Sequence, residues 1–256
     1  MTRRGPGPRG VALVSGGSGA IGEAICRTLH DDGWAVAIGY VSRERAEVLA
    51  ASLHTDDVPS WPVPLDMRDS ASVRSGIAGL LADAGRVDAA VYNGGLSRTA
   101  PFVETTEEDW AAEVAVNFLG PVLATHLLLP AMLENKGGSF VGITSEAAKL
   151  GDAAHAPYAA VKAALHAFFL SIVREYGRKG ILANSVAPGP IDTPMLRYTF
   201  SSPEQAEQVI GKLRRLVPVG RLGTPAEVAA AVRFLVSQSS FVAGQQISVG
   251  GGVSML

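Results

Sequence analysis

Residues 11–32 read VALVSGGSGAIGEAICRTLHDD, and this stretch decides the fold. A short apolar run at 11–15 leads into a cluster of glycines and then into a helical pattern over 21–32. Glycines at such a turn let the backbone approach a pyrophosphate closely, and the N-terminus of the next helix offers free N–H groups. Gly17, Gly19 and Gly22 make the spacing GxGxxG, which is a weak signal alone but a specific one between a strand and a helix. The stretch therefore predicts a dinucleotide site on an α/β fold.

The same alternation continues along the chain. Apolar runs precede longer helical patterns at 35–40 and 43–53, at 88–93 and 107–117, at 139–145 before Tyr158, and at 181–187 before Pro225. Because the runs lack strict alternation with polar residues, they are typical of parallel strands buried on both faces. We expect a single-domain Rossmann fold of the α/β class, a doubly wound parallel sheet of about seven strands with helices on both faces. Residues 1–9 are expected to form a flexible tail, 10–256 the domain, and 195–222 a mobile lid over a substrate cleft.

The composition narrows the classes of function. Of the 256 residues, 47% are hydrophobic and 18% are charged, which suits one globular core. The net charge of -2 arises from intermixed acidic and basic residues, so no broad basic field is available for nucleic acid. The first apolar run is too short for a signal peptide or a membrane span. The single cysteine, Cys26, can form neither a disulfide nor a metal site, and we expect a cytoplasmic protein without a metal or a membrane partner.

The end of the second apolar run points to the kind of dinucleotide. A NAD site places Asp or Glu about 20 residues beyond the glycines, where the carboxylate binds the ribose 2′-hydroxyl. Here the run ends in Tyr40, Val41, Ser42 and Arg43, with no acid at its tip. Guanidinium and hydroxyl groups both donate to a 2′-phosphate, so these residues favour NADP over NAD. An ordinary exposed arginine in the first turn of a helix is the plainer alternative for Arg43.

Tyr158 and Lys162 lie four residues apart in a helical pattern, and Ser145 ends the apolar run before it. Residues at this spacing share one face of a helix, so a phenol and an ammonium are held side by side. Lowering the pKa of a tyrosine from ~10 to ~7 requires about 4 kcal/mol. A cation at ~4 Å supplies a stabilisation of this order at an effective dielectric constant of ~20. The pair therefore predicts a proton donor, although the same spacing arises by chance on many solvated helices.

With these motifs in place, the chain resembles the short-chain dehydrogenases/reductases of the single-domain type, in pattern the 3-oxoacyl-acyl-carrier-protein reductases. The NNAG motif of that family corresponds to residues 92–95, with Tyr92 in place of the first asparagine, and its VDGG motif carries Gly250 in place of the aspartate. The resemblance implies a catalytic set of Asn117, Ser145, Tyr158 and Lys162, in which Asn117 holds a water that relays protons to Lys162. With the residues at 40–43, it implies a cofactor site of Gly16, Ser18, Gly19, Ile21, Tyr40, Ser42, Arg43, Asp66, Met67, Asn93, Gly94, Tyr158, Lys162, Pro188, Gly189, Ile191 and Thr193.

The resemblance also implies an activity. We expect an NADPH-dependent reductase that transfers hydride to a ketone carbonyl, first of all a 3-oxoacyl thioester on acyl carrier protein or CoA. The alternatives are a dehydrogenase of a cyclic or polyol secondary alcohol and a non-catalytic NADP-binding protein. A hydrolase is a poorer alternative, because residues 16–20 nearly spell the GxSxG motif but end in Ala20.

Partners follow from the same interpretation. An acidic carrier protein needs basic residues beside the cleft, and Lys136, Arg178 and Lys179 are the candidates. The helical patterns at 122–133 and 159–173 are apolar around most of their circumference. Such helices need cover on more than one side, which favours a homotetramer or a homodimer, although deep burial in a monomer gives the same pattern.

Overall fold

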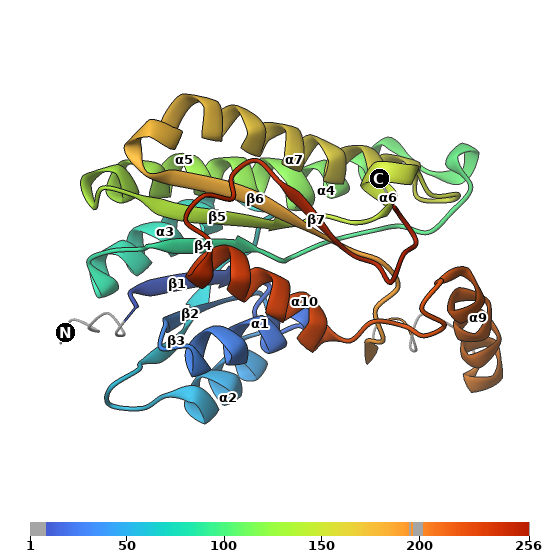
Figure 1. The fold of residues 1–256 in the computed structure, drawn as a ribbon, viewed down its shortest axis with the longest axis horizontal. Helices are drawn as coiled ribbons and strands as arrows, with labels where there is room; N and C mark the ends of the chain where they lie inside the picture. Colours follow the sequence, from blue (N-terminus) through green and yellow to red (C-terminus); the bar gives the residue numbers. More distant parts are fainter. Residues whose placement is uncertain (1–8, 195, 197–201, 256) are drawn as a thin grey trace.

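The computed structural model describes residues 9–194, 196 and 202–255, and its centre is a parallel sheet (Figure 1). Seven strands lie in the order β3-β2-β1-β4-β5-β6-β7. They are β1 (Val11–Ser15), β2 (Ala35–Tyr40), β3 (Ser60–Pro64), β4 (Ala89–Tyr92), β5 (Gly138–Ile143), β6 (Ile181–Pro188) and β7 (Gln246–Val249). The strand order reverses between β1 and β4, and ligands of such sheets bind at the carboxyl ends of the strands beside that point. The predicted doubly wound sheet is confirmed.

Helices cover both faces of the sheet (Figure 1). One face carries α1 (Ala20–Asp31), α2 (Arg43–Leu53) and α10 (Pro225–Arg233), and the other carries α3 (Ser70–Ala84), α5 (Gly120–Glu134) and α7 (Ala156–Tyr176). Successive strand residues point to opposite faces, so Leu13 packs in the core under α3 while Val14 packs under α1. This double burial explains why the strands read as unbroken apolar runs.

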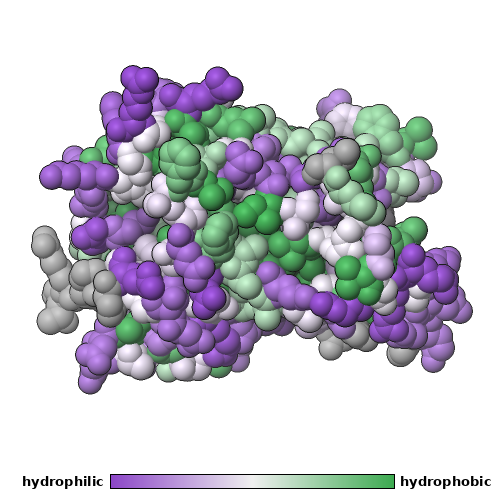
Figure 2. Space-filling model, in the orientation of Figure 1, coloured by the Kyte–Doolittle hydropathy of each residue, from purple (hydrophilic) through white to green (hydrophobic). Residues whose placement is uncertain are grey.

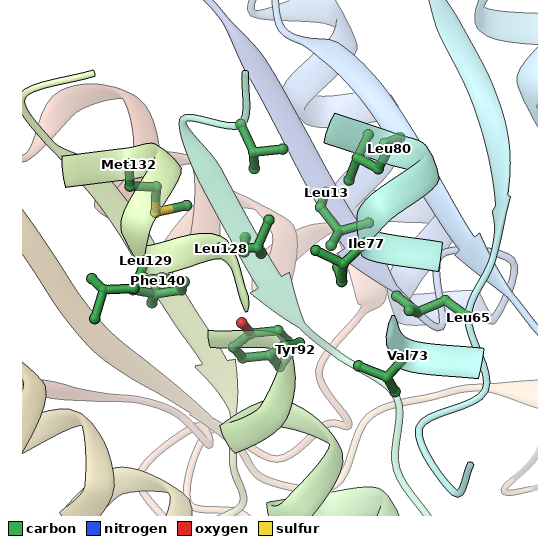
Figure 3. Packing of buried hydrophobic residues seen from close by; sticks show 14 of the residues in the cluster. Leu13, Leu65, Val73, Ile77, Leu80, Tyr92, Leu128, Leu129, Met132 and Phe140 are labelled. Atoms are coloured by element: carbon green, nitrogen blue, oxygen red, sulfur yellow. The ribbon is translucent and has the colours of Figure 1, made fainter. Parts of the chain in front are cut away.

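Tyr92 shows how one of these cores is braced. Its ring is buried, stacks with Phe140 and Phe169, and lies among side chains of α3 and α5 (Figure 3). Its hydroxyl lies 2.9 Å from the Thr125 hydroxyl on α5. Burial raises the pKa of this phenol, so it stays neutral and forms the hydrogen bond as a hydroxyl. The tyrosine therefore ties β4 to α5 at the position where the family has asparagine.

The helical pattern predicted over 107–117 is longer and less regular in the structure. After α4 (Glu107–Val114), one π-helical turn (Ala115–Leu119) joins directly to α5. Such wide turns are concentrated at functional sites, because they redirect a side chain without ending the helix. Here the turn contains Asn117, whose side chain is fully buried.

Among the residues that the structure describes, two long helices are apolar enough to cross a membrane by length and composition alone, at 107–134 and at 156–179. Both pack on the same face of the sheet, but only 39% and 33% of their most apolar windows are buried. Figure 2 shows hydrophobic residues along the upper edge of the molecule, where Figure 1 places α7. The apolar circumference predicted from the sequence is therefore only partly covered by this chain.

The segment predicted as a lid includes a helix, α9 (Pro203–Leu216). Ser202 caps it by accepting the Gln205 N–H, as the sequence predicts, and Ala206 and Ile210 are buried. Figure 1 shows α9 apart from the sheet, at the end to which the carboxyl ends of the strands point. Residues 195 and 197–201 of the expected lid lie outside the described part of the chain.

Candidate active site

A cleft of about 650 Å³ opens at the carboxyl ends of the strands. Its walls come from the loops after β1, β2, β3, β4, β5 and β6 and from one face of α7. Most of the expected site residues line it, namely Gly16, Ser18, Gly19, Ile21, Ser42, Asp66, Met67, Asn93, Gly94, Ser145, Tyr158, Lys162, Pro188, Gly189, Ile191 and Thr193. Of the expected residues, Tyr40, Arg43 and Asn117 do not line it.

The glycine turn after β1 forms a close-fitting cradle. Gly16 has φ +59°, and a Cβ on Gly22 would collide with the Gly16 carbonyl oxygen. The amide of Asn93 donates to the same oxygen at 3.1 Å, so β4 holds the turn in place. Because no side chain fills the turn at these positions, the backbone and the N-terminus of α1 are open to a pyrophosphate, and the cradle fits a dinucleotide.

The ribose end of the cleft differs from expectation. Arg43 points outward and pairs with Glu47 at 2.8 Å, with 76% of its side chain exposed. Arg45 lines the cleft instead, together with Ser42 and Arg68. Asp66 holds Arg68 in a bidentate pair at 2.7–3.1 Å, and this hydrogen-bonded guanidinium lowers the pKa of the Asp66 carboxyl. The positive groups at this end are therefore Arg45 and Arg68, not Arg43.

Ser145, Tyr158 and Lys162 meet at the other end of the cleft. The Lys162 ammonium donates to the Ile143 carbonyl at 2.9 Å and lies 5.6 Å from the centre of the Tyr158 ring. The lysine is buried, and burial lowers its pKa to about 8. The phenol and the amine therefore lie on one face of α7, as their spacing in the sequence predicts.

The predicted electrostatic effect of that pair is wrong for the chain by itself. The pKa of Tyr158 is raised, chiefly because burial disfavours the phenolate. The Ser145 hydrogen bond acts in the opposite direction, and the charges of Glu113 and Asp152 raise the pKa further. Burial also disfavours the lysine charge that was expected to stabilise the phenolate. The surroundings of Tyr158 within this chain therefore favour the phenol over the phenolate.

Asn117 lies behind the cleft wall. Its amide donates to the carbonyls of Leu96 and Glu113 at 2.7 and 3.0 Å, and its oxygen accepts the Leu96 N–H at 3.3 Å. A Cβ on Gly95 would lie 3.4 Å from the Asn117 oxygen and 3.5 Å from the Lys162 nitrogen. Glycine at this position thus leaves space between the two polar groups.

A polar cluster of Thr99, Asp152 and His155 lies beside Tyr158 but does not line the cleft. The His155 ring nitrogens lie 2.8 Å from the Thr99 hydroxyl and 3.1 Å from the Asp152 carboxylate. The His155 and Tyr158 rings lie 6.3 Å apart, edge to face. Proximity of His155 to Tyr158 in sequence was a signal, but only the fold brings the 95–101 loop to it.

The three basic residues expected beside the cleft, Lys136, Arg178 and Lys179, do not lie there. Lys136 lies two residues before β5, and Arg178 and Lys179 lie in the turn before β6. These are the amino ends of strands whose carboxyl ends carry the cleft, so within one chain the three residues lie at the opposite edge of the sheet. The expectation that they flank the cleft is therefore wrong for the single chain.

Comparison with known proteins agrees with this geometry. The family model described as enoyl-(acyl carrier protein) reductase matches residues 16–254. The chain is 33% identical to a 3-oxoacyl-[acyl-carrier-protein] reductase of Thermotoga maritima, over 95% of this chain and 97% of that protein. It is 34% identical to an acetoacetyl-CoA reductase of an Acinetobacter species, over 96% and 98%. A gluconate 5-dehydrogenase of Burkholderia cenocepacia, solved with NADP and tartrate, superposes with a TM-score of 0.87 at 30% identity and covers 95% and 94% of the two chains.

Proposed function

Because the chain belongs to the short-chain dehydrogenase/reductase family and is an oxidoreductase of the CH–OH/C=O class, we propose that it reduces a ketone at the expense of NADPH. The substrate that we favour is a 3-oxoacyl thioester, carried on acyl carrier protein or CoA. Relatives named as 3-oxoacyl-carrier-protein and acetoacetyl-CoA reductases match nearly the whole chain and support this choice. The observation on which the proposal rests is the meeting of Ser145, Tyr158 and Lys162 at one end of a dinucleotide-sized cleft.

The chain's own residues perform the acid chemistry of this reduction. A bound nicotinamide supplies the hydride. The Ser145 hydroxyl donates a hydrogen bond to the substrate oxygen as negative charge develops on it, which stabilises the transition state more than the ground state. Tyr158 transfers its phenolic proton to that oxygen. Lys162 holds the ribose beside Tyr158, and a water between Asn117 and Lys162 returns the proton from solvent.

We further propose that NADPH is preferred over NADH. Ser42, Arg45 and Arg68 line the ribose end of the cleft, and all three can donate to a 2′-phosphate. Asp66, whose carboxylate lines this end, is already paired with Arg68. The structural relative solved with NADP supports the same choice.

A second candidate is oxidation of a polyol or cyclic secondary alcohol. The Thr99–His155–Asp152 cluster beside Tyr158 carries hydroxyl and imidazole groups, which suit a hydroxylated substrate. The gluconate 5-dehydrogenase similarity favours the same class. A non-catalytic NADP-binding protein is the remote alternative.

Tyr158→Phe tests the catalytic proposal. We expect turnover to fall by roughly 10²- to 10⁴-fold, the loss typical of a removed general acid, while NADPH binding measured by fluorescence is retained. Tyr176→Phe, at the far end of the same helix, is the matched control and should keep full activity. Acetoacetyl thioesters, cyclic ketones and hexonates assayed in parallel distinguish the substrate classes. Full activity of Tyr158→Phe would exclude the mechanism.

We also propose that the protein is a cytoplasmic homotetramer, or a homodimer, with residues 195–222 as a lid over the substrate. The partly covered apolar helices at 107–134 and 156–179 support association. Association also gives three basic residues a role, namely Lys136, Arg178 and Lys179. In an antiparallel dimer, these residues of one subunit would lie beside the cleft of the other. The position of α9 beyond the carboxyl ends of the strands supports the lid.

A further inference from the structure

The short helix α6 (Ala147–Leu150) begins just after the serine of the candidate active site, and an amide of its first turn holds that side chain. The Ser145 hydroxyl accepts the Ala147 N–H at 3.1 Å. A serine hydroxyl has one proton to donate and two lone pairs with which it accepts, and the amide occupies one lone pair. The O–H bond is therefore directed away from α6. Since Ser145 lines the cleft, this restriction suits donation to a substrate oxygen.

The helix α6 needs outside support to keep this amide in place. It has only four residues, and helices of this length are unstable in water without packing. It packs against α7 on one side. Its start is attached to the sheet by the Glu146 N–H, which donates to the Pro188 carbonyl at 3.0 Å. The attachment of its other end therefore decides where the amide points.

Lys149 ties that other end to β7, the strand at the edge of the sheet. Its ammonium donates to the Ser248 hydroxyl at 2.6 Å. Ser248 pairs in register with Ala187 of β6, and Ala187 directly precedes Pro188. Both ends of α6 are thus attached to neighbouring strands close to their carboxyl ends, where the cleft opens.

We propose that Lys149 is a positioning residue for Ser145: its bond to Ser248 fixes α6, and α6 fixes the Ser145 hydroxyl through the Ala147 N–H. Loss of the bond frees the end of α6, so the hydroxyl also takes directions that miss the substrate oxygen. A misplacement of about 1 Å can cost roughly 10²-fold in rate. The inference rests on the proposed function of Ser145 as a hydrogen-bond donor to the substrate.

Lys149→Met and Ser248→Ala each remove one half of the link, and the packing of α6 on α7 remains. We expect each variant to lower kcat for ketone reduction roughly 10-fold, within the cost of such a misplacement, and to leave the KM for NADPH unchanged. Ser248→Thr keeps the hydroxyl and should recover most of the loss. Ser75→Ala is the matched control and should keep full kcat, because it removes an exposed hydroxyl that bonds to carbonyls of its own helix.

A Ser145→Ala background separates positioning from a general loss of structure. Without the hydroxyl, α6 has no group to orient, so Lys149→Met should cause no further fall in kcat in this background. The proposal is overturned if Lys149→Met lowers kcat by the same factor in both backgrounds. It is also overturned if Lys149→Met and Ser248→Ala both keep full kcat.

A measurement without substrate distinguishes this inference from the proposed function. Ser145→Cys places a thiol where the Ala147 N–H can stabilise the thiolate, and the native Cys26 is buried. The pH midpoint of alkylation by iodoacetamide, followed by mass spectrometry, should rise when Ser248→Ala is added, even though Lys149 keeps its charge. If the midpoint rises but the unaltered protein turns over no ketone or alcohol, only the proposed function fails. An unchanged midpoint would refute the link from Ser248 to residue 145.

Discussion

Arg43 and Arg45 lie two positions apart at the start of α2, yet only Arg45 lines the cleft. Helical side chains turn by about 100° per residue, so these two point to nearly opposite sides. Arg43 takes the outer side and meets Glu47 four residues later. The sequence predicts basic residues at this place but not which of them faces the cleft. The choice depends on how α2 is rotated on the sheet.

Arg45→Ala should raise the KM for NADPH roughly 10- to 100-fold and leave that for NADH nearly unchanged. The reason is the loss of a charge-assisted contact to the 2′-phosphate, worth about 1.5–3 kcal/mol. Steady-state kinetics with both cofactors measures it. Arg43→Ala is the control with little expected effect, and equal losses for both cofactors would contradict the assignment.

Among the elements, α6 (Ala147–Leu150) is linked to the end of β7 by side-chain contacts. Glu146 precedes α6 and is buried, and a Cβ on Gly250 would come within 3.0 Å of its side chain. Lys149 on the same short helix donates to Ser248 at 2.6 Å. Gly250, where the family has aspartate, thus leaves the space that Glu146 occupies.

Gly250→Asp should therefore destabilise the fold by about 2–4 kcal/mol, because it forces a second carboxylate against a buried one. Urea unfolding measures the loss. Glu146→Ala in the same chain should recover much of it, since it vacates the space. Gly79→Asp, at a glycine whose added Cβ meets nothing within 4 Å, should change stability little. Simple additivity of the two substitutions at 146 and 250 would disprove the coupling.

At the scale of the whole molecule, the apolar surface of α5 and α7 is the main feature that one chain leaves unexplained. Leu170 on α7 is 38% exposed although it lies in a largely apolar helix. A soluble monomer rarely keeps such a surface uncovered, and a second copy of the same face is self-complementary cover.

We expect light scattering to give a mass two or four times the 26.5 kDa of the chain. Leu170→Glu should lower that mass by placing a charge on the apolar face. Val48→Glu, at a residue 68% exposed on α2 on the other side of the sheet, is the control and should leave the mass unchanged. A monomer in the unaltered protein would refute the proposed assembly.

Residue patterns alone are enough to predict the layered α/β fold, the glycine turn after β1 and the helical pairing of Tyr158 with Lys162. Each depends on periodicity or on spacing within one element, which local geometry sets directly. Only the tertiary structure decided that Arg45 replaces Arg43, that the Lys136 patch lies away from the cleft, and that the Tyr158 pKa rises rather than falls. These outcomes depend on burial and on contacts between distant segments, such as Glu113 with Arg98, and no pattern within a single segment encodes the dielectric surroundings that such contacts create.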